Sequence, residues 1–191
     1  MLRRVQEQIE PLRRSRSLSF NNGTDFIARP VTIVATGNVP HEVVARTNKH
    51  RDIFFDAPLD DLRSPPTELA YRSVMSPEST HGSSRDPIPQ ASTWDANNSY
   101  YASTSFRRTF GYPWTGRLSS NKMDLLRHQI REAHLKGLQV RYWDTPAWPI
   151  SLRNDIWRVL LEEGSDVLNV DDLRAAAFLD WRNVQHDWFN G

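Results

Sequence analysis

Short apolar runs recur along this chain and are separated by stretches with a helical pattern. Five runs rich in β-branched or aromatic residues have the length of buried strands, and they cover residues 30–37, 52–59, 99–106, 138–143 and 167–170. Gly37 closes the first run and Pro58 ends the second, as expected where strands give way to turns. The pattern predicts five strands.

Apolar residues at helical spacing lie before and between these runs. Leu2, Val5, Ile9 and Leu12 form one stripe at the N-terminus. Cap residues and glycines mark further helices, predicted for residues 41–50, from Ser120 or Asn121 to Gly137, from Ser151 to Gly164, and after Asp171 or Asp172. The first stripe starts without a cap, so we expect the chain to be a piece of a longer protein.

Strands that alternate with helices are joined by crossovers, so the predicted fold class is α/β with a parallel sheet. A closed (β/α)₈ barrel needs eight strands and roughly 250 residues. Five strands in 191 residues cannot close such a barrel. We expect a single domain over residues 1–191, interrupted by the segment 60–98.

The segment 60–98 is rich in Ser, Pro, Thr, Asp and Asn, and no regular core element is expected in it. Its few aromatic anchors are Tyr71 and Trp94, near its ends. A connection of this length is usually functional or disordered. The composition favours a disordered loop over a catalytic lid.

Composition excludes several function classes. Lys and Arg number 24 against 23 Asp and Glu, for a formal charge of +1, so no nucleic-acid partner is expected. The absence of cysteine excludes thiolate chemistry. No apolar run approaches the roughly 20 residues of a membrane span, which predicts a soluble chain. The Arg-rich start resembles a mitochondrial transit peptide, but Glu7 and Glu10 break that pattern.

Ligands of α/β sheets bind at the carboxyl ends of the strands. The candidate pocket residues at these ends are Asn38, Asp56, Ser103, Arg141, Trp143, Asp171 and Asp172. Asp56 is the best carboxylate, because an apolar strand leads into it, although a role in anchoring a loop is equally open. Arg141 needs a partner, either a carboxylate or a substrate phosphate.

Other candidates have competing structural explanations. Trp143 could stack on a ligand or belong to the core. Asp171 and Asp172 could bind a divalent cation, but aspartates at a helix start more often cap the helix. The six histidines form no metal-binding spacing, and none lies at a predicted strand end, so none is expected to be a catalytic base. A nucleotide site is disfavoured because no phosphate-binding glycine motif is present.

Five segments resemble, in order, the C-terminal half of the fungal altered inheritance of mitochondria protein 6 family: residues 30–38, 51–59, 100–103, 140–146 and 167–173. This family is similar to glycerophosphodiester phosphodiesterases, within the phospholipase C-like phosphodiesterase superfamily of TIM barrels. The resemblance implies a partial TIM-type barrel and a phosphoric diester hydrolase of lipid metabolism. It also implies a phosphodiester or phospholipid-derived substrate and, in a complete member, Mg²⁺ or Ca²⁺. Location stays open, with mitochondrial association or secretion of a full-length form both possible.

The family's catalytic groups have no counterpart here. Its members carry a histidine–asparagine motif on the first strand, a metal-binding glutamate and aspartate on the second, and another histidine on the third. No stretch of this chain matches these motifs. What the resemblance carries over is part of the pocket wall: Trp143 matches a substrate-contacting aromatic, and Asp171 and Asp172 match the closing strand-end motif.

Two functional hypotheses follow. The first is a partial phosphodiesterase domain, inactive alone because the metal and the acid–base pair supply most of the rate. The alternative is a non-catalytic binding or complementation module that uses its open sheet edge. The chain could derive from a truncated gene model or be a true short protein.

Overall fold

The computed structural model describes residues 2–37, 50–62, 94–113 and 117–181. The elements, in chain order, are α1 (Leu2–Arg14), β1 (Phe20–Asn21), β2 (Phe26–Ile27), β3 (Ile33–Ala35), β4 (Ile53–Pro58), η1 (Leu59–Asp61), β5 (Ser99–Ser105), α4 (Phe106–Phe110), α5 (Ser120–Leu135), β6 (Gln139–Trp143), α6 (Ile150–Glu162), β7 (Val167–Leu168) and α7 (Leu173–Phe178). Asn38, residues 41–49 of the helix predicted for 41–50, and residues 63–93 of the expected loop lie outside the described residues.

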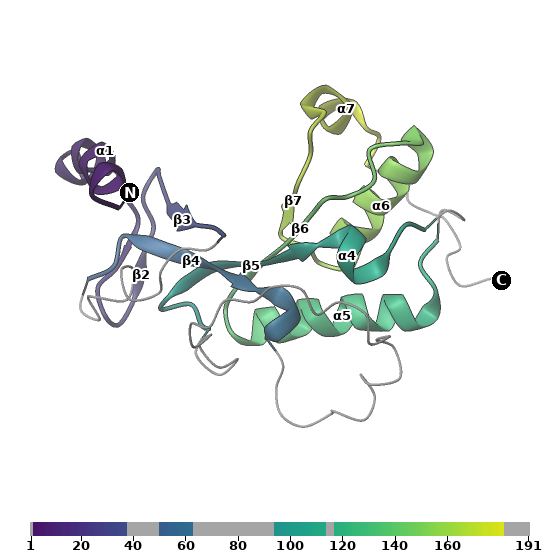
Figure 1. Cartoon of the computed structure of the whole chain (residues 1–191), viewed down its shortest axis with the longest axis horizontal. Coiled ribbons are helices and arrows are strands. Elements are labelled where there is room, and N and C mark those ends of the chain that lie inside the picture. Colours follow the sequence, from purple (N-terminus) through teal and green to yellow (C-terminus); the bar gives the residue numbers. More distant parts are fainter. Residues whose placement is uncertain (1, 38–49, 63–93, 114–116, 182–191) are drawn as a thin grey trace.

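Five parallel strands form one sheet in the order β3-β4-β5-β6-β7 (Figure 1). The α/β class and the partial TIM-type barrel are confirmed, and all five predicted strands are present. The outermost strands are shorter than predicted, three residues in β3 and two in β7. Each pairs with one neighbour within the part of the sheet that the structure describes.

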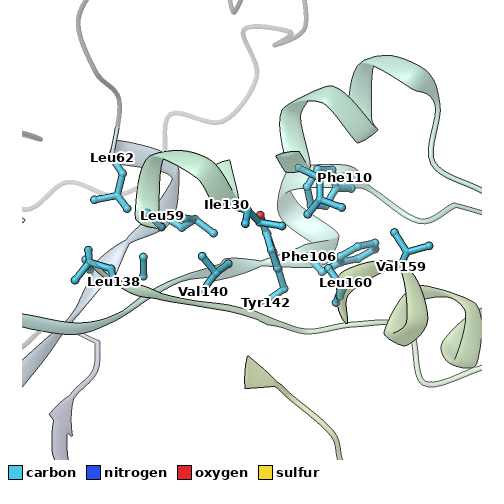
Figure 2. Packing of buried hydrophobic residues seen from close by; sticks show 14 of the residues in the cluster. Leu59, Leu62, Phe106, Phe110, Ile130, Leu138, Val140, Tyr142, Val159 and Leu160 are labelled. Atoms are coloured by element: carbon cyan, nitrogen blue, oxygen red, sulfur yellow. The ribbon is translucent and has the colours of Figure 1, made fainter. Parts of the chain in front are cut away.

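The hydrophobic core lies between the sheet and its helices (Figure 2). Alternate residues of each strand face this layer, as in the pair Val140 and Tyr142 of β6. Phe106 and Phe110 of α4 pack at the carboxyl end of β5, with ring centroids 5.0 Å apart. Because one face of every strand is used by the core, the remaining residues point to the opposite face.

The two ends of the segment 60–98 belong to the core, which its composition does not predict. Leu59–Asp61 forms a 3₁₀ turn, and Leu62 after it is 1% exposed. Trp94 is also buried, and its ring packs edge-on against Phe55, 5.5 Å between centroids. The expectation of disorder concerned mainly residues that lie outside the described parts of the chain.

Helix boundaries follow the predicted signals in part. Gly137 and Gly164 follow α5 and α6 with φ of +71° and +99°, a conformation that glycine adopts easily. The prediction that Ser151 caps α6 is wrong, because the helix begins at Ile150 and its N-cap is Pro149. None of the described helices has the length and apolar character of a membrane span.

The amino-terminal end of the sheet is covered by the β1–β2 hairpin and by α1 (Figure 1). The Asn22 side chain accepts hydrogen bonds from the backbone N–H groups of Thr24 and Asp25 and so closes the turn. Phe26 of β2 packs against Phe54 of β4, with ring centroids 5.3 Å apart. The hairpin therefore closes the end of the sheet opposite to the strands' carboxyl ends.

Arg13 fastens α1 to the start of β4. Its guanidinium donates from Nε and Nη2 to the two carboxylate oxygens of Asp52, with 2.9 Å between Nη2 and Oδ1. This hydrogen-bonded pair holds the pKa of Asp52 below its usual range, although burial acts in the opposite direction. The carboxylate is largely buried, so the pair is better shielded from solvent than most surface ion pairs.

Replacing Asp52 by asparagine tests this contact. A carboxyl whose pKa is lower in the folded state stabilises the fold above its unfolded pKa, and that stability is lost as the pH falls through the folded value. We expect Asp52→Asn to lower the free energy of unfolding at neutral pH by about 1 kcal/mol. The deficit should shrink progressively below about pH 4.

Urea unfolding at a series of pH values measures this difference between the original chain and the variant. Asp25→Asn is the matched control, because Asp25 is exposed in the β1–β2 turn. The control should change little at any pH. A deficit for Asp52→Asn that is the same at neutral pH and at about pH 3 would contradict the role of the ionised carboxylate.

Candidate functional site

A group of polar side chains lies on the sheet face opposite the helices. Asp56, Ser103 and Arg141 belong to β4, β5 and β6, and Asn169 follows β7. Ser103 is in register with Arg141, and Arg141 with Val167, two residues before Asn169. We call these four residues the polar cluster.

The cluster is connected by specific contacts. The Ser103 hydroxyl donates to Oδ2 of Asp56 at 2.8 Å. Arg141 donates from Nε and Nη2 to Oδ1 of Asn169, at 3.2 and 2.7 Å. Nη1 of Arg141 lies 3.8 Å from Oδ2 of Asp56, which is beyond a hydrogen bond. The contacts thus cross all four strands from β4 to the end of β7.

The side chain of Asp56 is 10% exposed, against 27% for that of Arg141. Oδ1 of Asp56 is buried and has no hydrogen-bond partner among the residues that the structure describes. Burial raises the pKa of this carboxyl, while the bond from Ser103 and the charge of Arg141 act in the opposite direction. A buried acceptor without a donor is costly, so this oxygen needs an explanation, and a role in a functional site is one.

Trp143 lies two residues beyond Arg141 on β6 and is 40% exposed. By the alternation of a strand, both side chains are on the same face. Asp144 follows with φ of +57° and accepts a hydrogen bond from Ser105 Oγ at 3.0 Å. Trp143 is therefore presented at the carboxyl end of the sheet beside the polar cluster, and it does not belong to the buried core.

Asp171 and Asp172 lie outside the cluster. Asp172 caps α7, since its Oδ1 accepts from the backbone N–H of Ala175 at 2.9 Å. That bond is the main reason why the pKa of Asp172 is below its usual range. Arg153 of α6 also donates to Asp172 Oδ2, at 3.2 Å. The capping interpretation is confirmed for Asp172, while Asp171 is exposed.

The structure thus brings Asp56, Ser103 and Arg141 together and adds Asn169. Asn169 lies near the end of the run 167–170, two residues before Asp171, and is not among the candidate pocket residues that the sequence predicts. The signal that identifies it is the strand alternation, because residues 167 and 169 lie on one face. The partner that Arg141 required is mainly this amide, with the Asp56 carboxylate farther away.

A second polar group, on the helix side of the sheet, was not predicted. Asp60 in η1 accepts hydrogen bonds from Thr104 Oγ1 at 2.7 Å, Arg108 Nη2 at 2.9 Å and Gln129 Nε2 at 3.0 Å. The Tyr142 hydroxyl donates to Gln129 Oε1 at 3.0 Å. Both carboxylate oxygens of Asp60 accept hydrogen bonds from protein donors. This group therefore joins η1 to the sheet and its helices.

The residues that the structure describes do not fit the divalent metal that the resemblance implies. Mg²⁺ and Ca²⁺ prefer several oxygen ligands, above all carboxylates. No three His, Asp or Glu side chains gather into a possible metal site within the described ranges. The polar cluster supplies a single carboxylate together with a cation, which opposes a second positive charge.

A protein-family model and several known proteins match this chain. Residues 1–56 match the model of the AIM6-like phosphodiesterase domain. An altered inheritance of mitochondria protein 6 homolog from Arthroderma benhamiae is 33% identical over 177 residues, which cover 90% of this chain and 46% of the relative. The resemblance to this family is confirmed. The altered inheritance of mitochondria protein 6 of Eremothecium gossypii is 33% identical over 153 residues, covering 80% of the chain and 35% of that protein.

The Saccharomyces cerevisiae protein of the same name is 28% identical over 165 residues, 81% of this chain and 37% of its own length. The chain therefore spans less than half of the length of these relatives. The match to the phosphodiesterase domain model ends at Asp56, so the other members of the polar cluster lie beyond the matched range. No solved structure matches the chain.

Proposed function

We propose that this chain supplies one wall of the substrate pocket in a phosphodiesterase-like domain. The observation that carries the proposal is the convergence of Asp56, Ser103 and Arg141 on one face of a parallel sheet. The helices cover the other face with the core, and the Arg141 side chain, which is 27% exposed, is available to a ligand. In barrels of this class the ligand binds inside the carboxyl end of the strands.

The proposed substrate is a small phosphodiester, or a molecule derived from a phospholipid. Such a molecule combines an anionic phosphate with an apolar or polyol part. Arg141 offers a cation, and the exposed ring of Trp143 offers apolar surface at the same end of β6. The names of the matched relatives and their phosphodiesterase domain support this class of ligand.

We further propose that residues 1–191 do not hydrolyse phosphodiesters by themselves. Hydrolysis needs a nucleophile, charge stabilisation and a positioned acid or base, and proton transfer alone contributes about 10²–10⁴-fold. The polar cluster holds neither a histidine nor a second carboxylate. Its groups can bind and orient a phosphate, but they offer no acid–base pair across a scissile bond.

A hydrolysis assay tests this proposal. The purified chain is incubated with a glycerophosphodiester and, separately, with a lysophospholipid, each with Mg²⁺ or Ca²⁺ and each with EDTA. We expect no release of product above that of the Trp143→Ala variant. Metal-dependent hydrolysis by the original chain that Trp143→Ala reduces would overturn the proposed inactivity and would show that the chain contains a full catalytic site.

A further inference from the structure

Four arginines among the described residues donate hydrogen bonds from both Nε and Nη2. Arg153 donates both to Oδ1 of Asn154, at 3.1 and 2.9 Å, and its Nη1 donates to Asp172. Arg13 is bound along its Nε and Nη2 edge by the carboxylate of Asp52. Arg127 is bound in the same way by Glu163, with both distances 2.7 Å. Arg141 uses that edge for the amide oxygen of Asn169. An amide carries no charge, so Asn169 fixes the guanidinium without neutralising it.

The remaining end of the Arg141 guanidinium is free to bind a ligand. Nη1 makes no hydrogen bond with the residues that the structure describes, and its nearest carboxylate oxygen is 3.8 Å away in Asp56. The side chain is 27% exposed, so solvent and small solutes reach it. Guanidinium groups bind phosphate oxygens through such free N–H donors.

We propose that Arg141, oriented by Asn169, binds the oxyanion of a phosphate group, and that Asp56 limits the strength of this binding. The inference rests on the proposed function for the idea that the ligand is a phosphodiester. The phosphate would bind at Nη1 of Arg141, and the two neighbours of this arginine would have opposite effects. Asn169 positions the cation, and Asp56 opposes the anion.

The opposing role of Asp56 follows from its position. An ionised carboxylate 3.8 Å from Nη1 lowers the positive potential that an incoming phosphate meets. Its Oδ2 already accepts a hydrogen bond from Ser103, and its buried Oδ1 has no donor within the described parts of the chain. Removing the charge while keeping the acceptor for Ser103 should therefore strengthen phosphate binding. A purely structural Asp56–Arg141 pair would give no such gain.

The test is a titration of the full chain with dimethyl phosphate and, separately, with inorganic phosphate. Binding is followed by the NMR shifts of the backbone amides of residues 103, 141 and 169. Arg141→Gln should raise the Kd by about tenfold or more. Asp56→Asn should lower the Kd by about threefold or more, because it removes the repulsion. Arg29→Gln is the control, because Arg29 is exposed and distant in sequence from Arg141, and it should leave the Kd unchanged.

Arg141→Lys serves as a second variant in case Arg141→Gln does not fold. It keeps the charge beside Asp56, but an ammonium cannot reproduce the planar arrangement that joins Asn169 and a phosphate. We expect its Kd to rise by about threefold or more. Similar Kd values for the original chain and either Arg141 variant would overturn the inference, as would weaker binding by Asp56→Asn.

The two phosphates distinguish the source of the ligand. Binding of both supports a site for a phosphate oxyanion, whereas inorganic phosphate alone at the same residues would overturn the link to phosphodiesters. Because the titration involves no turnover, its outcome is independent of the hydrolysis assay. Hydrolysis by the isolated chain would overturn the proposed inactivity and leave the Arg141 contact standing.

Discussion

Replacing Phe106 by alanine is expected to lower the free energy of unfolding by about 3–5 kcal/mol. Phe106 begins α4 directly after β5 and is 0% exposed. Its ring packs on Phe110, which in turn packs on Tyr142 of β6, with ring centroids 5.8 Å apart. Truncation would leave a cavity between a strand and a helix at the carboxyl end of the sheet, where neighbouring groups have little freedom to collapse.

Urea denaturation at neutral pH measures this loss, and Phe178→Ala is the matched control. Phe178 belongs to α7 and is 81% exposed, so its removal should change stability by less than about 0.5 kcal/mol. The comparison holds the chemistry of the substitution constant and varies only burial. Equal effects of the two substitutions would mean that Phe106 is not part of the core.

Replacing Asp60 by alanine is expected to lower the free energy of unfolding by about 2–4 kcal/mol. Thr104 and Gln129, which donate to Asp60, are 1% and 6% exposed. Without the carboxylate these buried donors lose a partner, and each such loss costs about 1–3 kcal/mol. The contact of exposed Arg108 with Asp60 adds little, because solvent screens it.

Asp61→Ala is the control, because it removes the same side chain from the next position of the same 3₁₀ turn. Asp61 is exposed, and its substitution should change stability by less than about 0.5 kcal/mol. Urea unfolding of both variants measures the difference. If Asp60→Ala were as stable as Asp61→Ala, the buried donors would have found other partners and the group around Asp60 would not be structural.

The sequence predicted the elements of the sheet well, because each depends on local patterns. The β-branched run 30–37 and the run 138–143 identify β3 and β6, and Gly137 marks the boundary between helix and strand. The N-caps predicted from the sequence were less reliable than the strands. Asp172 caps α7 as predicted, but α6 starts before Ser151 and its N-cap is Pro149. Proline is favoured at the first helical position and not at the N-cap, so no cap preference in the sequence indicates this start.

The candidate site was predictable in part. Asp56, Ser103 and Arg141 were identified because parallel strands bring their carboxyl ends to one edge. That rule does not say which face of the sheet each residue occupies. Asp171 and Asp172 satisfied the rule, yet Asp172 caps α7 through the backbone N–H of Ala175 and Asp171 is exposed. Asp60 was missed because it follows the end of β4 inside a segment that reads as a loop.

The sequence by itself determined the α/β class, the order of the strands along the chain and the polar residues near their ends, since these depend on neighbours in the chain. Only the tertiary structure decided which of these residues meet. A register shift after Phe55 pairs Asp56 with Tyr101 instead of Tyr100, and therefore places Ser103 on the face of Asp56. Because β6 pairs with β7, Arg141 hydrogen-bonds the Asn169 amide, while the Asp56 carboxylate lies farther away. Side chains alternate between faces along a strand, so a shift of one residue between strands exchanges every contact across the sheet.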